Sequence, residues 1–400
     1  MAGYLNRHRA SQLMQERGLS ALVLAQPESI TYATGAFAGV ASFWRRAGAA
    51  FVMVPADPAS PMAAVVGDLQ AKSFASQSAI VDVRSHRIWV ETDRYPQPDL
   101  SKPKRNPRPA QFELSQSLEL LRDILSERRL LNSPIGLELG FIPAADFSAF
   151  STIPVQWLDC TSIVERLRSV KQPEEISKLR QAAELATAGR TKLIQSIGLG
   201  QTSQEMVEFW KQSVSASAAK KKCAELQSSW AYISVGGDGF APGGPVKLGD
   251  MIKIDVGCVI DGYSSDGARS VVVGKPDPQA VRVYDTLHRA FDAGLALMKP
   301  GTLLSDMYFA TANSMWDSGF ETYGRGHFGH GVGASIWSEE WPFISAAATA
   351  RLQPNMMLAF ETPWYIDGLG GFIIEDQILI TETGHEVMAP SARELECLEV

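Results

Sequence analysis

The strongest constraint on this chain is a segment that forms a tight hairpin pattern and carries acids among apolar residues. Residues 252–266 read IKIDVGCVIDGYSSD, and the central Asp-Gly is the strongest short signal for a two-residue hairpin loop. With that loop, Ile260 pairs with Tyr263, and Asp255 and Asp266 become diagonal cross-strand neighbours about 7–8 Å apart at their backbones. Both carboxylates can then converge on one site.

Two acids that point inward from such an apolar hairpin need compensation. Like charges repel in a low-dielectric site and lose their hydration, which costs several kcal/mol per ion. A divalent cation held between the acids supplies that compensation. The pattern leaves a second interpretation open, in which the acids face solvent or pair with an arginine such as Arg269.

A second acid-bearing hairpin follows near the C-terminus. The runs MLAFE and FIIED each carry an acid among β-like residues, and DGLGG supplies a turn between them. A turn centred near Gly368 places Glu361 directly opposite Glu375. Either acid, taken alone, is equally compatible with a salt bridge or an exposed position.

A glycine-rich segment lies between the two hairpins. Residues 324–333 read GRGHFGHGVG, and two of the six histidines of the chain, His327 and His330, stand three positions apart in it. Glycine lets the backbone approach a ligand closely and adopt positive φ. The pattern favours a binding site, although a single histidine is often a satisfied core residue.

The order of these residues resembles the pita-bread metallopeptidase family, which includes methionine aminopeptidase, prolidase and aminopeptidase P, with creatinase as a metal-free relative. The resemblance covers about residues 173–385. It implies an α+β protein with a C-terminal pita-bread fold and two divalent ions, of manganese, cobalt, iron or zinc. The family's metal ligands fall on Asp255 in IDVG, Asp266 in GYSSDGARS, His330 in GHGVG, Glu361 in AFETP and Glu375 in IIEDQ.

The first half of the chain has a different character. Strand-like runs such as 21–24 and 49–54 alternate with helical patterns such as 118–130, which favours helices packed on a sheet. The resemblance identifies residues 1–160 as a smaller α/β creatinase-type N-terminal domain and residues 161–400 as the pita-bread catalytic domain.

Peptidases of this family carry two further histidines that this chain lacks. One should stand seven residues beyond His330, where the sequence has Trp337, and the other should precede Asp255, where residues 236–244 contain no histidine. In the peptidases these histidines hold the substrate amide and help to move protons. The chain therefore resembles the non-peptidase members, such as creatinase and ectoine hydrolase, but with its metal ligands retained.

Four residues near the expected centre are candidates for substrate binding or proton transfer. Arg325 is a candidate partner for a substrate carboxylate, and His327 is a candidate catalytic proton carrier because histidine titrates near neutral pH. Tyr263 and Trp337 are candidate substrate-binding residues of the pocket. An ion pair for Arg325 and simple packing for Trp337 remain open alternatives.

The resemblance also implies a partner subunit. In prolidases and creatinases, the N-terminal domain of a partner closes the site, so we expect a homodimer. Trp44 and Arg45, in the cluster FWRR, are candidates to reach a substrate anion in the partner's site. Interface packing is the alternative role of this cluster.

The function expected from these features is metal-dependent hydrolysis of a C–N bond in a small amino-acid-derived substrate. Ions bridged by Asp266 and Glu375 would lower the pKa of a bound water, and Glu361 is the expected catalytic proton acceptor. Alternatives are an Xaa-Pro dipeptidase or aminopeptidase, a metal-dependent lyase on the same scaffold, and a non-catalytic binding protein.

The bulk composition excludes other classes. A net charge of −7 and a pI of about 5.5 give no basic footprint for nucleic acid. The sequence has no apolar run long enough to predict a membrane span and no secretory signal pattern. Four scattered cysteines without C-x-x-C pairs favour the reducing cytoplasm.

Overall fold

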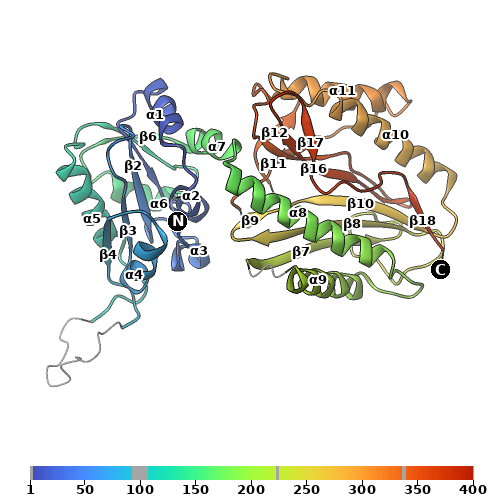
Figure 1. Ribbon diagram of the computed structural model, residues 1–400, viewed down its shortest axis with the longest axis horizontal. Coiled ribbons are helices and arrows are strands. Elements are labelled where there is room, and N and C mark those ends of the chain that lie inside the picture. Colours follow the sequence, from blue (N-terminus) through green and yellow to red (C-terminus); the bar gives the residue numbers. More distant parts are fainter. Residues whose placement is uncertain (1–2, 92–106, 222–224, 336–338, 400) are drawn as a thin grey trace. The chain divides into compact units, whose positions relative to one another are not determined.

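The computed structural model divides the chain into two compact units, Met1–Arg168 and Ser169–Val400 (Figure 1). The predicted boundary at residue 160 falls at the start of helix α7 (Thr161–Ser169). Most of α7 belongs to the first unit, where the carbonyl of Leu167 accepts a hydrogen bond from the Tyr32 hydroxyl at 3.2 Å. The structure describes residues 3–91, 107–221, 225–335 and 339–399.

The first unit is built on a mixed six-stranded sheet with the strand order β4-β3-β2-β1-β5-β6. Strands β1, β5 and β6 are parallel, whereas β2 is antiparallel to both of its neighbours. Every residue of β1 and β2 is buried, so these two strands form the centre of the core. The strands are β1 (Ala21–Leu24), β2 (Phe51–Pro55), β3 (Ala63–Gly67), β4 (Asp82–His86), β5 (Pro134–Leu137) and β6 (Gln156–Asp159). The helices before α7 are α1 (Arg7–Glu16), α2 (Pro27–Thr34), α3 (Val40–Trp44), α4 (Asp68–Gln77), α5 (Leu114–Glu127) and α6 (Ala144–Phe150).

The second unit is built on a ten-stranded sheet with the main path β12-β11-β13-β16-β10-β8-β7. Strands β9, β17 and β18 pair with β8, β16 and β10, and β14 and β15 form a separate ribbon. The strands are β7 (Leu226–Val235), β8 (Met251–Ile260), β9 (Tyr263–Ser264), β10 (Gly267–Val273), β11 (His327–Gly331), β12 (Glu340–Ser345), β13 (Met357–Glu361), β14 (Trp364–Ile366), β15 (Gly370–Phe372), β16 (Ile374–Ile380), β17 (His385–Val387) and β18 (Glu396–Leu398).

Two helix pairs accompany this sheet. Helices α8 and α9 lie along β7 and β8, and α10 and α11 lie beside the other half of the sheet (Figure 1). No helix in the described part of the chain has the length and apolar character needed to cross a lipid bilayer. The helices are α8 (Pro173–Ile194), α9 (Ser203–Lys220), α10 (Pro278–Leu295) and α11 (Leu304–Asp317).

Strand β8 explains why one face of the sheet is polar. Side chains alternate between the two faces of a strand, and Ile252, Ile254 and Val256 join the apolar core against α8 and α9. Lys253 and Asp255 therefore point to the opposite face. The apolar residues fix this register, because a shift by one residue would drive both charges into the core.

The other half of the sheet follows the same rule. Leu358 and Phe360 of β13 and Ile374 of β16 pack in the core beside α10 and α11. Glu361 and Glu375 alternate with these residues and so lie on the opposite face of their strands. The two hairpins thus bring their acids to one polar face of the sheet.

Helix α8 begins where the sequence predicts a helix start. Pro173 occupies the first turn, and the side chain of Glu175 reaches back to accept a hydrogen bond from the Gln172 N–H at 2.7 Å, which completes a capping box. Burial raises the pKa of Glu175 to about 7. Its other oxygen accepts a hydrogen bond from the Tyr263 hydroxyl at 3.0 Å.

Candidate metal centre

The first predicted hairpin has the predicted register. Ile260 pairs with Tyr263 across the Asp-Gly turn, and Ala268 of β10 pairs with Asp255 of β8. Asp266 precedes β10 by one residue, so it lies diagonally across from Asp255, as expected. The local sequence alone therefore fixed the relative position of these two acids.

The second predicted hairpin is also confirmed. Glu361 of β13 pairs directly with Glu375 of β16. The same register continues through the ribbon, where Ile366 of β14 pairs with Gly370 of β15. The turn is centred on Gly368, whose φ of +81° is a conformation that glycine adopts without strain.

The sheet order places all five acids and histidines of interest on neighbouring strands. The path β11-β13-β16-β10-β8 is continuous, and each strand carries one of them or directly follows it. Only the strands of the two hairpins, β8 with β10 and β13 with β16, lie close together in the sequence. The site is therefore assembled by contacts between segments that are distant in sequence. In strand order they are His330, Glu361, Glu375, Asp266 and Asp255.

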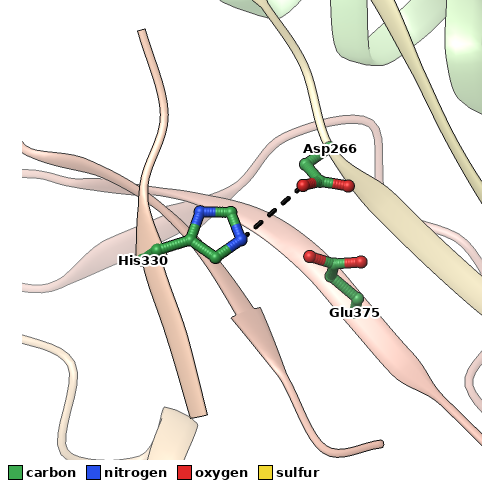
Figure 2. Close-up of side chains that lie close together, drawn as sticks. All are labelled: Asp266, His330 and Glu375. Carbon is green, nitrogen blue, oxygen red and sulfur yellow. Dashed lines mark ion pairs between the residues drawn. The ribbon is translucent and has the colours of Figure 1, made fainter. Parts of the chain in front are cut away.

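Three of the five side chains converge closely. Ligand atoms of Asp266, His330 and Glu375 all lie within 4.8 Å of one another, and all three residues are buried. Figure 2 shows the imidazole facing the Asp266 carboxylate, with 3.6 Å between His330 Nε2 and Asp266 Oδ2, and the Glu375 carboxylate beside them. One imidazole nitrogen and several carboxylate oxygens form a donor set that suits manganese, iron, cobalt or zinc.

The hydrogen bonding of His330 prepares it to bind a cation. Its Nδ1 lies 3.1 Å from the carbonyl oxygen of Gly331, which can only accept a hydrogen bond. Nδ1 must therefore carry the proton in the neutral ring, which leaves the lone pair of Nε2 directed at Asp266. A backbone carbonyl on the far nitrogen is the usual way in which proteins orient a metal-binding histidine.

The acids of the cluster cannot all be ionised at low cost. Burial raises the pKa of Glu375 well above its ordinary value, and the charges of Asp266, Glu361 and Asp255 raise it further. Buried acids that repel one another in this way are stabilised when a cation binds between them. The donor set and the uncompensated charge both fit a divalent metal ion.

Asp255 differs from Asp266, His330 and Glu375 because a lysine of the same strand lies beside it. Lys253 Nζ lies 3.2 Å from Asp255 Oδ2, and the Lys253 side chain is almost completely buried. Burial opposes the charge on Lys253, yet Asp255 raises its pKa. The sequence analysis missed Lys253, although its position two residues before Asp255 on one strand puts both on the same face.

Glu361 is also paired with a basic group. Arg325 Nη2 lies 2.6 Å from Glu361 Oε1, and His327 Nδ1 lies 3.7 Å from the same oxygen. The ion pair left open for Arg325 is therefore present in this structure. Both contacts use Oε1, so Oε2 has no hydrogen-bond partner among the described residues.

His327 is neutral and has a defined tautomer. Burial lowers its pKa. The backbone N–H of Gly329 donates to His327 Nδ1 at 3.2 Å, so the proton of the neutral ring lies on Nε2. The His327 side chain is only partly buried.

One other predicted role, that of Tyr263, and one open alternative, that of Arg269, are not supported by the geometry. Tyr263 is completely buried and its hydroxyl is engaged by Glu175, so it holds the start of α8 and offers no group to a substrate. Arg269, the open alternative partner of the hairpin acids, pairs with Asp376 at 2.6 Å. Trp337 lies outside the described residues.

Trp44 and Arg45 belong to the first unit, where both side chains have partners. Trp44 packs against Trp89, with 4.3 Å between ring centroids. Arg45 Nη1 lies 2.5 Å from Glu28 Oε1. The predicted contact of these residues with a partner's site stays a prediction.

Comparisons with known proteins agree with this architecture. A curated relative, the Xaa-Pro dipeptidase of Pyrococcus horikoshii, is 28% identical over 58% of this chain and 66% of its own length. The chain thus matches just under two thirds of that relative. The Xaa-Pro dipeptidase from Bacillus anthracis has the same fold, with a TM-score of 0.79 at 22% identity over 98% of this chain and 99% of that one.

The same fold occurs in a protein whose name describes no catalysis. The N-terminal domain of FACT complex subunit SPT16 from Cicer arietinum gives a TM-score of 0.70 at 15% identity, over 97% of this chain and 96% of that one. At such identities the solved structures show the fold alone. They confirm the predicted pita-bread fold with its additional N-terminal domain.

Models of two known protein families match this chain. Residues 7–170 match the creatinase/prolidase N-terminal domain. Residues 177–382, more than half of the chain, match metallopeptidase family M24. The chain therefore belongs to metallopeptidase family M24.

Proposed function

We propose that this protein is a metal-dependent hydrolase that cleaves a C–N bond in a small amino-acid-derived substrate. The observation that carries the proposal is the convergence of Asp266, His330 and Glu375 within 4.8 Å, with the Nε2 lone pair of His330 directed into the cluster. Membership in a metallopeptidase family supports the same chemistry.

The chain's own residues have separate roles in this proposal. Asp266, His330 and Glu375 would hold a divalent ion, which supplies an acidified water and a polarised substrate carbonyl. Glu361 would accept a proton through Oε2, since Arg325 donates to its other oxygen. His327, whose neutral ring carries its proton on Nε2, would donate a hydrogen bond to the substrate, and Glu361 would pass the proton it has accepted to the leaving nitrogen.

We expect the number of bound ions to depend on Lys253, which lies beside Asp255. The structure supports one strong position at Asp266, His330 and Glu375, and a second, weaker position at Asp255, where an ion must compete with the Lys253 ammonium. We expect the wild type to retain one manganese ion per chain after dialysis. Lys253→Met should retain close to two, as counted by elemental analysis.

The substrate class is narrowed by what the chain lacks. The curated relative is named Xaa-Pro dipeptidase, which supports an Xaa-Pro dipeptidase or aminopeptidase as the alternative activity. Neither of the two peptidase histidines is present in the sequence, which favours a non-peptide amide or amidine substrate. Arg325 would pair with the substrate carboxylate through N–H groups that it does not use on Glu361.

A substrate panel tests the proposal. Xaa-Pro dipeptides, N-acyl amino acids, N-substituted glycines and cyclic amidines would each be incubated with protein loaded with manganese, cobalt, iron or zinc. Turnover of an amide or amidine that is lost in Asp266→Ala supports the proposal, and turnover of the dipeptides alone selects the peptidase alternative. Full metal occupancy with no hydrolysis would favour the lyase or the non-catalytic binding protein.

We also propose a cytoplasmic homodimer in which Trp44 and Arg45 contact the partner's site. Partial exposure of Arg45 and its position beside the exposed Phe43 support an interface role. Light scattering would give the mass in solution. A monomer with full activity would contradict the role of a partner subunit.

A further inference from the structure

A cavity in the C-terminal unit lies outside the cluster of Asp266, His330 and Glu375. Its volume is about 500 Å³, which is within the range of small-molecule sites. The floor is formed by buried residues of α8 and β10, and the rim by exposed residues of α8 and the C-terminal segment. The lining includes Arg190, Ile194, Arg269, Val271, Ser391 and Glu394.

Two buried arginines line this cavity, and they differ in how they are satisfied. Each is 4% exposed. Arg269 uses all five of its N–H groups: it donates to four backbone carbonyls, including those of Ala392 and Ser391, and to the carboxylate of Asp376. It therefore has no donor left for a bound molecule.

Arg190 is the opposite case. Its guanidinium donates one hydrogen bond, from Nη2 to the Ser391 hydroxyl at 2.9 Å. No carboxylate of the described residues lies within ion-pair distance of it, although Asp376 and Glu375 act on it from farther away. Burial, followed by the charge of Arg269, lowers the pKa of Arg190 to about 10, so the group remains a cation at neutral pH.

A buried cation without an ionic partner is costly, because the charge has lost its hydration. Asp376, Glu138 and Lys253 are about as deeply buried, and each has ionic or multiple hydrogen-bonded partners. Arg190 instead presents unused N–H donors at the wall of a cavity. We propose that this cavity binds a small organic monocarboxylate, with its carboxylate on the Arg190 guanidinium and its apolar part against Ile194 and Val271.

The chemistry of the walls selects this ligand class. A planar guanidinium fits a carboxylate with two parallel hydrogen bonds. Ile194 and Val271 provide an apolar surface for a short hydrocarbon group. Glu394 and Glu396 stand exposed at the rim and repel anions of higher charge, such as phosphate, more strongly than a single carboxylate.

Binding of a carboxylate in this cavity would also affect the metal centre. Arg190 lines a second, much smaller space together with Asp266 and Glu375. A carboxylate bound on Arg190 neutralises a positive charge beside those acids, so it should favour a cation among them. The inference about the cavity itself does not depend on the proposed hydrolase activity.

Saturation-transfer NMR with isovalerate tests the site, because the method detects binding in the millimolar range. Isovaleramide, which has nearly the same shape without the charge, is the matched ligand. Spectra would be recorded for protein with added manganese and for protein with chelator. We expect binding of isovalerate in both conditions and at least tenfold weaker binding of isovaleramide.

Three variants locate the binding. Arg190→Met removes the cation, and Thr191→Trp narrows the mouth of the cavity from an exposed position on α8. Both should weaken isovalerate at least tenfold, while the control Lys192→Met, which removes a charge from the same helix outside the cavity, should not. If Arg190→Met does not fold, Thr191→Trp decides. Binding that needs manganese, that survives both cavity variants, or that is absent in the wild type would overturn the proposal.

Discussion

Glu375 and Asp376 are neighbours on β16 and both are buried, but their carboxylates have opposite electrostatic surroundings. Three other acids surround Glu375, and together with burial they raise its pKa well above the ordinary value. Asp376 points to the other side, where Arg269 and Arg393 approach to 2.6 and 2.7 Å. Although burial works against ionisation, these arginines hold the pKa of Asp376 below its usual range.

We interpret Asp376 as an acid that stabilises the fold and, on the proposed function, Glu375 as an acid that binds a cation. The charge of Asp376 is neutralised within the chain, so its removal should harm folding. The charge of Glu375 is not neutralised, so the acid adds repulsion to the metal-free fold and becomes favourable only when a cation binds.

The largest effect is expected for Asp266→Ala. Loss of one of three converging donors should reduce turnover at least about 1,000-fold and abolish metal retention, because the ion can no longer be held. The fold should persist, with an unchanged circular dichroism spectrum. Glu382→Ala, which removes an exposed acid of the same unit, is the control; normal turnover in Asp266→Ala would contradict the assignment of the centre.

A comparison of Asp376→Asn with Glu375→Gln tests the contrast on stability. Asp376→Asn leaves the buried Arg269 and the partly exposed Arg393 without their acid and should lower the free energy of unfolding by about 3–5 kcal/mol. Glu375→Gln removes a group whose ionisation is opposed by burial and by the neighbouring acids, so it should leave the stability of metal-free protein unchanged or higher. Urea unfolding in the presence of chelator measures both. Equal losses of the free energy of unfolding in the two variants would contradict the difference between Asp376 and Glu375.

A smaller, pH-dependent effect is expected at Glu175. Its folded pKa of about 7 exceeds the unfolded value, so its contribution to stability is full below pH 4 and is lost as the pH rises toward 7. Glu175→Gln keeps the capping box but cannot ionise. Between pH 5 and 8 the variant should therefore gain about 2–3 kcal/mol relative to wild type. Parallel stability curves would show that Glu175 is not buried in the manner described.

The smallest effect is expected for Arg325→Met. Arg325 pairs with Glu361 at 2.6 Å and is the candidate for a substrate carboxylate. Its loss should raise KM about tenfold while the metal content stays the same, because it contacts the substrate and not the ion. A fall in metal content with unchanged KM would mean that Arg325 only orients Glu361.

The sequence predicted those parts of the site that depend on local pairing. Both hairpin registers, and so the relative positions of Asp255 and Asp266 and of Glu361 and Glu375, follow from turn residues and the two-residue period of strands. The convergence of His330 with these acids depends on the order β11-β13-β16-β10-β8, which no local pattern specifies. Only the family resemblance supplied that step.

The partners of the charged groups could not be derived in the same way. Lys253 lies on the acidic face by simple alternation, yet its contact with Asp255 depends on how the sheet excludes water around it. Arg190 gave no signal at all, since a cation in an amphipathic helix is ordinarily exposed. Its burial results from packing of α8 on strands far away in sequence.

The central claim is that the acids on neighbouring strands are held for a cation, and calorimetric titration of metal-free protein with manganese tests it most directly. Near pH 7 we expect saturable binding of at least one ion per chain. Titrations in two buffers of different ionisation enthalpy would show whether binding releases protons. Protons should be released, because an ion must displace the proton that repulsion keeps on the cluster around Glu375. Absence of saturable binding at millimolar manganese, or identical binding by Asp266→Ala, would contradict it.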